Sequence, residues 1–130
     1  GSLNIECALF ALEHASVFDE QARLIRQERE RLQASLHRLP GTRPYPSEGN
    51  MVLLRVAPEG APASEAAAFA RCVFEGMKAR GVLVRDVSAM HPMLAGCLRL
   101  TVGSASDNAR MLAALTAALA DALNAAIQPA

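Results

Sequence analysis

The sequence contains few of the residues that several common functions require. It has no Trp, one Tyr and four Phe, and its 13 basic residues balance its 13 acidic residues to a net charge of zero. Nucleic-acid binding relies on a basic surface and aromatic stacking, so the composition argues against a nucleic-acid partner. No apolar run approaches the roughly 20 residues of a membrane span, and the N-terminus does not look like a secretory signal. We therefore expect a cytoplasmic protein without a membrane partner.

Cysteine is also scarce. Cys7, Cys72 and Cys97 are odd in number and share no C-x-x-C spacing. That pattern argues against a disulfide framework and against a zinc site. We predict reduced thiols and no bound metal.

Lysine is scarcer still, since Lys78 is the only one among the 13 basic residues. A Schiff-base lysine needs desolvation or a cationic neighbour. Lys78 instead falls in the last turn of a predicted helix, where the helix dipole favours the ammonium. No Ser/His/Asp or Cys/His arrangement and no pair of carboxylates has a recognisable local context, and His91 is expected to structure its loop. We predict no catalytic residue in this chain.

Apolar residues recur at helical spacing in four segments, residues 4–14, 16–39, 64–80 and from 104 onward. Ser16, Ser64 and Ser104 are predicted to cap the last three, and Gly81 to end the third. The longest segment predicts one apolar stripe about six turns long. This stripe consists of Phe18, Ala22, Ile25, Arg29, Leu32, Leu36 and Leu39, and the opposite polar face carries Glu20, Arg23, Gln27, Glu30, Arg31 and Gln33.

Three strands are predicted between the helices, at residues 51–57, 82–85 and 97–102. This order favours an α+β domain with a small, mostly antiparallel sheet of three to four strands covered by helices, behind a long N-terminal helix. We interpret residues 1–2 as a cloning remnant, residues 3–39 as an interdomain segment with the long helix, and residues 40–130 as the small α+β domain.

Two of the predicted strands carry arginines where periodicity would predict Val, Ile or Thr. Arg85 ends one strand, and Arg99 lies within the next. A buried cation costs several kcal/mol unless an anion pairs with it, so the two arginines suggest a site for an anionic ligand. The alternatives are an edge-strand Arg99 that reaches water, and an exposed Arg85–Asp86 ion pair.

Several motifs together resemble histidinol-phosphate aminotransferase. They are Tyr45-Pro46-Ser47-x-Gly49-Asn50, the helix end VFEGMKARG with the strand VLVRD after it, and GCLRLTVG around Arg99. The resemblance covers most of the chain but only the C-terminal part of that enzyme, its small domain. It implies the aminotransferase small-domain fold, with Arg85 and Arg99 as the substrate-binding arginines.

The resemblance also implies an activity for the intact protein. That activity is pyridoxal-phosphate-dependent exchange of an amino group, converting L-histidinol phosphate and 2-oxoglutarate to imidazole acetol phosphate and L-glutamate in histidine biosynthesis. The domain with the cofactor lysine is missing, so we expect this chain alone to bind no pyridoxal phosphate and to be inactive. Without that domain the long helix exposes its apolar stripe, and we expect a homodimer or helix exchange. The alternatives are another fold-type I aminotransferase, a phosphothreonine decarboxylase, or a free-standing anion-binding or assembly module.

Overall fold

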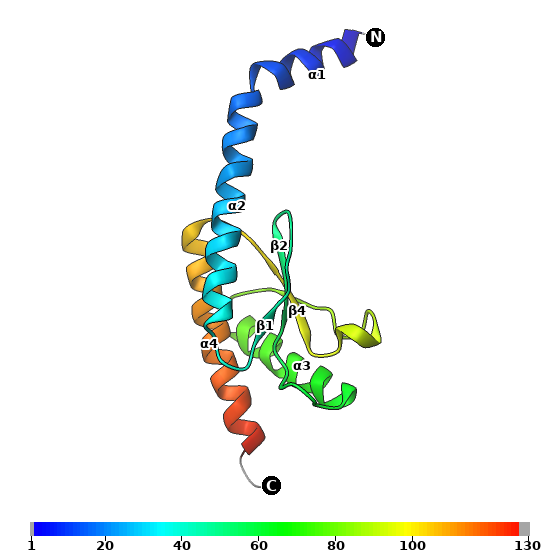
Figure 1. Ribbon diagram of the computed structural model, residues 1–130, viewed down its shortest axis with the longest axis vertical. Helices are drawn as coiled ribbons and strands as arrows, with labels where there is room; N and C mark the ends of the chain where they lie inside the picture. The colour runs from blue at the N-terminus through cyan, green and yellow to red at the C-terminus, as the bar shows by residue number, and fades with distance from the viewer. Residues whose placement is uncertain (1, 128–130) are drawn as a thin grey trace.

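The computed structural model describes residues 2–127, which form a sheet with helices on one of its faces (Figure 1). Gly1, interpreted above with Ser2 as a cloning remnant, lies outside the described residues. In chain order the elements are α1 (Ser2–Glu13), α2 (Ala15–His37), β1 (Arg43–Pro44), β2 (Met51–Arg55), α3 (Ala63–Ala79), β3 (Arg85–Asp86), the 3₁₀ turn η1 (Pro92–Leu94), β4 (Cys97–Thr101) and α4 (Ala105–Ile127). The α+β prediction is confirmed.

The described part of the chain forms a four-stranded sheet in the order β1-β2-β4-β3, in which every pair is antiparallel. Side chains alternate between the two faces of a strand. On β2 and β4, Val52 lies opposite Leu100 and Leu54 opposite Leu98, and all four are fully buried. The other face carries Leu53 opposite Arg99. One face of the sheet therefore holds the core, and the other holds the arginines.

The core lies between that apolar face and helices α2, α3 and α4. From α2 it takes Leu32 and Leu36, and α3 and α4 supply the other helical residues of the core. On α4 Ala122 is buried, whereas its neighbour Leu123 is exposed. The helical contributions are Leu32, Leu36, Ala70, Val73, Met77, Met111, Ala114, Leu115, Ala118, Leu119 and Ala122.

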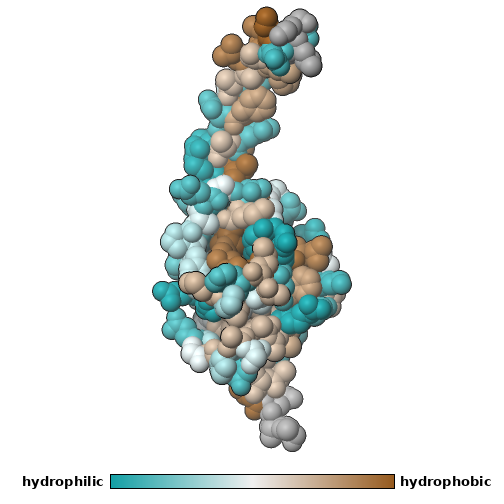
Figure 2. All heavy atoms as spheres, turned by 90° about the vertical axis from the view of Figure 1, so that its right-hand side faces the viewer, coloured by the Kyte–Doolittle hydropathy of each residue, from teal (hydrophilic) through white to brown (hydrophobic). Residues whose placement is uncertain are grey.

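The long helix is buried only in its second half. Phe18 and Ile25 are 47% and 40% exposed although they belong to the predicted apolar stripe. Helix α1 and the first half of α2 extend beyond the body of the domain (Figure 1), and Figure 2 shows hydrophobic side chains on this extension. The large apolar residues exposed there are Ile5, Leu9, Phe10, Leu12, Val17, Phe18, Leu24 and Ile25.

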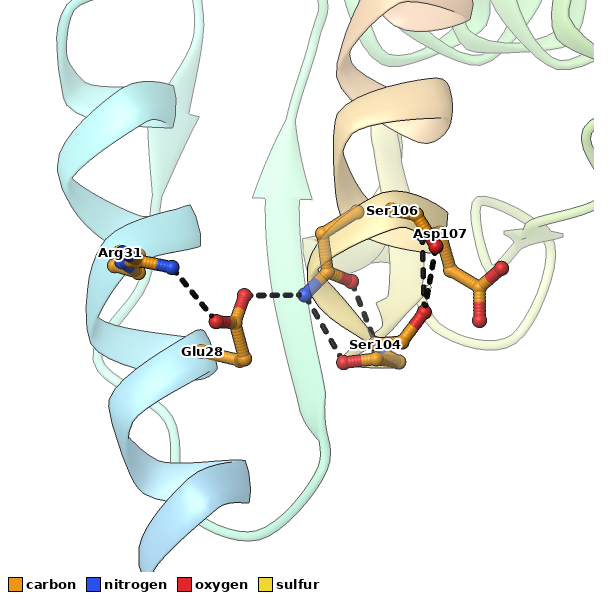
Figure 3. Close-up of polar contacts among 7 residues, drawn as sticks. Glu28, Arg31, Ser104, Ser106 and Asp107 are labelled. Atoms are coloured by element: carbon orange, nitrogen blue, oxygen red, sulfur yellow. Dashed lines mark hydrogen bonds and ion pairs between the residues drawn. The ribbon is translucent and has the colours of Figure 1, made fainter.

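Polar contacts join α2 to the start of α4 (Figure 3). Asn108 is buried; its amide nitrogen donates to Glu28 Oε2 at 3.2 Å and to the Gly103 carbonyl at 3.1 Å. Its side-chain oxygen accepts from the Gly103 N–H at 2.9 Å. Glu28 also pairs with Arg31 on its own helix. The predicted Ser104 cap is confirmed, because its hydroxyl accepts from the Asp107 N–H at 3.2 Å.

Several predicted boundaries were wrong. Helix α2 starts after His14 and α3 after Pro62, neither with a side-chain cap, so Ser16 and Ser64 do not cap them. Strand β3 is limited to Arg85–Asp86 instead of residues 82–85, because Val82 and Val84 pack against the core without pairing with β4. The predicted strands 51–57 and 97–102 end earlier, at Arg55 and Thr101. Strand β1 was not predicted as a strand.

The membrane interpretation needs one correction. Helix α4 is long and apolar enough to cross a membrane by length and composition alone. Of its apolar window 33% is buried. The buried part includes Leu115, Ala118 and Leu119, which pack in the core of the domain.

Candidate anion-binding face

Arg85 and Arg99 lie directly opposite each other on neighbouring antiparallel strands. Residues in this position share a face, with their Cβ atoms about 5 Å apart. Arg99 is half-buried, whereas Arg85 is exposed. Within residues 2–127 neither guanidinium makes an ion pair or a side-chain hydrogen bond. The two cations thus present unused donors to the same space, which is the requirement for gripping an oxyanion.

Neither alternative explanation of the arginines fits the structure. Strand β4 is internal to the sheet, so Arg99 is not an edge-strand residue. Asp86 lies opposite Leu98, on the other face from Arg85, and its carboxylate accepts from the Ser88 N–H at 3.0 Å. An Arg85–Asp86 ion pair is therefore absent from the described residues. The structure brings the two predicted site residues together, and neither is neutralised within the domain.

A further arginine on the same face, Arg55, was not singled out from the sequence. Its Nε donates to the Tyr45 hydroxyl at 2.9 Å, Nη1 to the Ala95 carbonyl at 2.8 Å, and Nη2 to the Met93 carbonyl at 3.1 Å. The Tyr45 hydrogen bond raises the pKa of Arg55 above its usual value, while partial burial opposes this. Arg55 is thus a cation held by neutral groups. Its position in an apolar strand was the signal that could have identified it.

Tyr45 belongs to the segment with the Tyr-Pro-Ser motif, and α2 holds that segment in place. Gln33 donates to the Tyr45 carbonyl and to Ser47 Oγ, both at 2.9 Å. Arg29 donates to the Gly49 carbonyl at 2.7 Å. Gln33, which the sequence places on the polar face of α2, thus uses its amide to hold this segment. The motif residues therefore connect the long helix to the arginine-bearing face.

The connection between β3 and β4 is joined to this face by Arg55, which donates to two of its carbonyls. Within it the His91 ring accepts from the Met93 N–H at 3.0 Å, so the expected loop-structuring role is confirmed. Cys97 begins β4 and is fully buried, and burial raises the pKa of its thiol. All three cysteines are free thiols, with Cys7 and Cys72 exposed.

Lys78 does not belong to this face. It is exposed near the end of α3, on the helical side of the sheet, while its neighbour Met77 points into the core. Arg85 and Arg99 lie on the other face, so Lys78 and these two arginines do not form one site for pyridoxal phosphate. Residues 2–127 also hold no group of His, Cys, Asp and Glu side chains suited to a metal.

Comparison with curated proteins gives a consistent result. The chain is 57% identical over 118 residues to the histidinol-phosphate aminotransferase of Acidovorax sp., and 53% identical over 113 residues to that of Methylibium petroleiphilum. The chain is similar to part of histidinol-phosphate aminotransferase. These matches cover 90% and 87% of the chain, but the chain spans only 29% and 28% of the length of those relatives. The resemblance predicted from the motifs is thereby confirmed. No protein-family profile matches the chain.

Solved structures support the fold. An alpha-aminoadipate aminotransferase from Thermus thermophilus, complexed with N-(5'-phosphopyridoxyl)-L-leucine, matches with a TM-score of 0.68 at 18% identity. The match covers 89% of this chain and 30% of that one. A decarboxylase from Sulfurospirillum multivorans matches with a TM-score of 0.57 at 23% identity, over 72% of this chain and 24% of that one. Both likenesses fit the aminotransferase small-domain fold predicted above.

Proposed function

We propose that this chain is the substrate-gripping small domain of a pyridoxal-phosphate-dependent aminotransferase. The intact protein converts L-histidinol phosphate and 2-oxoglutarate to imidazole acetol phosphate and L-glutamate in histidine biosynthesis. In this proposal residues 40–130 form the small domain and residues 3–39 connect it to the domain that carries the cofactor. The intact enzyme is a cytoplasmic homodimer. The identity of 57% over most of the chain is the observation that carries the proposal.

The register of Arg85 and Arg99 supports the chemistry of this proposal. L-histidinol phosphate presents a phosphate and no carboxylate, whereas L-glutamate presents carboxylates. A guanidinium donates two parallel hydrogen bonds to either kind of oxyanion, so one pair of arginines serves both substrates in turn. The arginines bind and orient the substrate, and the chemistry belongs to the cofactor that the rest of the protein supplies.

A chimeric enzyme tests the proposal directly. This chain replaces the matching segment of the Acidovorax enzyme, and transamination of L-histidinol phosphate is measured. We expect activity close to that of the parent, and a loss of at least about a hundredfold in kcat/KM for Arg99→Ala, because a charge-assisted bidentate contact is removed. Arg71→Ala is the matched control, because Arg71 is an exposed arginine on α3 that pairs with Glu75.

Two results would overturn the proposal. One is a folded, cofactor-loaded chimera that releases carbon dioxide from its substrate instead of exchanging the amino group, which would favour the decarboxylase alternative. The other is an active chimera that is indifferent to Arg99→Ala. For the chain by itself we expect no visible absorption band on addition of pyridoxal phosphate. A stable band that Lys78→Ala abolishes would show that this domain carries a Schiff-base site of its own.

A further inference from the structure

We propose that Arg55 is a positioning residue that fixes the separation of Arg85 and Arg99, by holding the connection that joins their two strands. This inference rests on the proposed function, in which Arg85 and Arg99 grip the substrate oxyanion. Arg55 lies on β2, and the residues it holds, Met93 and Ala95, belong to the β3–β4 connection (residues 87–96). Its role is therefore exerted through the loop, without contact with the substrate.

The contacts of Arg55 use the full shape of its side chain. All three of its nitrogen atoms donate. The acceptors are two backbone carbonyls of the β3–β4 connection and the Tyr45 hydroxyl. Tyr45 is in turn fixed by Gln33 of α2 through its carbonyl. Since a lysine has one nitrogen on a flexible stem, it cannot reproduce these diverging bonds. A continuous set of hydrogen bonds thus runs from the long helix to the connection.

Apolar packing alone would hold this connection poorly. Met90 and Met93 are 58% and 78% exposed, and the buried residues around its end are small, Ala95 against Ala57 and Ala66. Its other hydrogen bonds lie near its two ends, and there the Gly96 carbonyl accepts from the Val56 N–H at 2.8 Å and from the Ala57 N–H at 3.3 Å. The Val87 N–H donates to the Cys97 carbonyl at 3.3 Å, and the Gly96 N–H donates to Ser88 Oγ at 3.1 Å. The two hydrogen bonds from Arg55 differ from these, because they reach the loop from a side chain on strand β2.

Strand β3 depends on that loop for its position. It pairs with β4 through Arg85 and Asp86 alone, at the edge of the sheet. A two-residue edge strand has few ladder hydrogen bonds, so its placement is sensitive to the segment that follows it. Release of the loop therefore frees β3 to separate from β4, and Arg85 moves relative to Arg99. Two guanidinium groups that grip one oxyanion need a fixed separation, because a small misplacement weakens substrate positioning.

The test uses the chimera described above with Arg55→Lys and Tyr45→Phe. We expect Arg55→Lys to raise KM for L-histidinol phosphate about tenfold and to change kcat at saturation less than twofold, because binding is weakened and the chemistry is untouched. Tyr45→Phe removes one of the three acceptors and is expected to give a smaller rise in KM. Arg43→Lys is the matched control: Arg43 lies opposite Arg55 on β1, is exposed, and pairs with Glu59 instead of the loop.

A second measurement is made on the 130-residue chain, so that a fold defect is recognised. Amide hydrogen exchange in Arg55→Lys is expected to rise at Val87 and Gly96, while Leu54 and Leu98 in the sheet core keep their protection. Unchanged exchange at Val87 and Gly96 would overturn the proposal. So would an unchanged KM in a chimera whose KM responds to Arg99→Ala, a result that leaves the proposed function intact. An inactive parent chimera would count against the proposed function only, and the exchange data would still decide the role of Arg55.

Discussion

Gly96 is the residue at which the β3–β4 connection meets the body of the domain. Its φ is +88°, and a Cβ there would lie 2.7 Å from the Ala57 Cβ and 3.1 Å from the Ala66 Cβ. Both the backbone conformation and the space therefore require glycine. Its carbonyl accepts from the Val56 N–H at 2.8 Å, so the glycine also ties the loop to the end of β2.

We expect Gly96→Ala to lower the free energy of unfolding by about 2–4 kcal/mol, since it adds a steric clash to the backbone strain. Gly60→Ala is the control, because Gly60 has a φ of +81° but no atom within 4 Å of the added Cβ. It is expected to cost about 1 kcal/mol, from the backbone alone. Urea denaturation of the two variants measures the difference, and equal losses would show that the contact with Ala57 is unimportant.

Cys97 is expected to make the fold sensitive to alkaline pH. Burial raises the pKa of its thiol, so the folded state holds this proton more tightly than the unfolded state does. The stabilisation from the protonated thiol is full below the ordinary thiol pKa of about 8.5 and is lost as the pH rises above it. Urea denaturation at neutral and alkaline pH should show a larger loss for the parent than for Cys97→Ala. Equal losses would contradict the assignment.

At the scale of elements, the helices and the two central strands could be predicted because their core residues repeat with the period of the structure. Leu98 and Leu100 on β4, like Val73 and Met77 on α3, are buried as their spacing predicts. Strand β1 could not be found this way, because a two-residue strand with a proline has no period. The Arg55 contacts were also beyond reach, since they join residues 40 and 38 positions apart.

Asn108 gives a prediction about how α2 and α4 are joined. We expect Asn108→Ala to lower the free energy of unfolding by about 1–3 kcal/mol, because it leaves the polar groups of Gly103 and Glu28 without their buried partner. Thr116→Ala on the same helix is the control: Thr116 is exposed and its hydroxyl bonds only to the Leu112 carbonyl. Thermal unfolding measures both variants. A loss for Thr116→Ala as large as that for Asn108→Ala would contradict this account.

At the scale of the whole molecule, the extension formed by α1 and the first half of α2 stands out. Packing within the domain does not explain its apolar side chains. Its apolar side chains are covered by nothing in the described residues. The relatives are more than three times as long as the segment they share with this chain. In the proposed enzyme, further protein lies against this extension, and without it the extension is a surface that favours association.

We therefore expect the isolated chain to self-associate as its concentration rises. Sedimentation velocity measures this, with Phe18→Glu and Ile25→Glu combined as the disruptive variant and Gln27→Glu as the control for added charge on an exposed position of α2. The double variant should sediment as a monomer, and the control should behave as the parent does. A parent chain that stays monomeric at every concentration would contradict the expectation.

The register of Arg85 and Arg99 also has a consequence for the evolution of this domain. Like charges directly across an antiparallel pair disfavour the sheet, and here one of them is half-buried. The domain thus carries a local conflict that an uncharged residue at either position would remove. Stability alone favours an uncharged residue at one of the two positions, and the proposed binding of the substrate oxyanion accounts for both arginines. The pair marks a position where the sequence is less stable than its own fold permits.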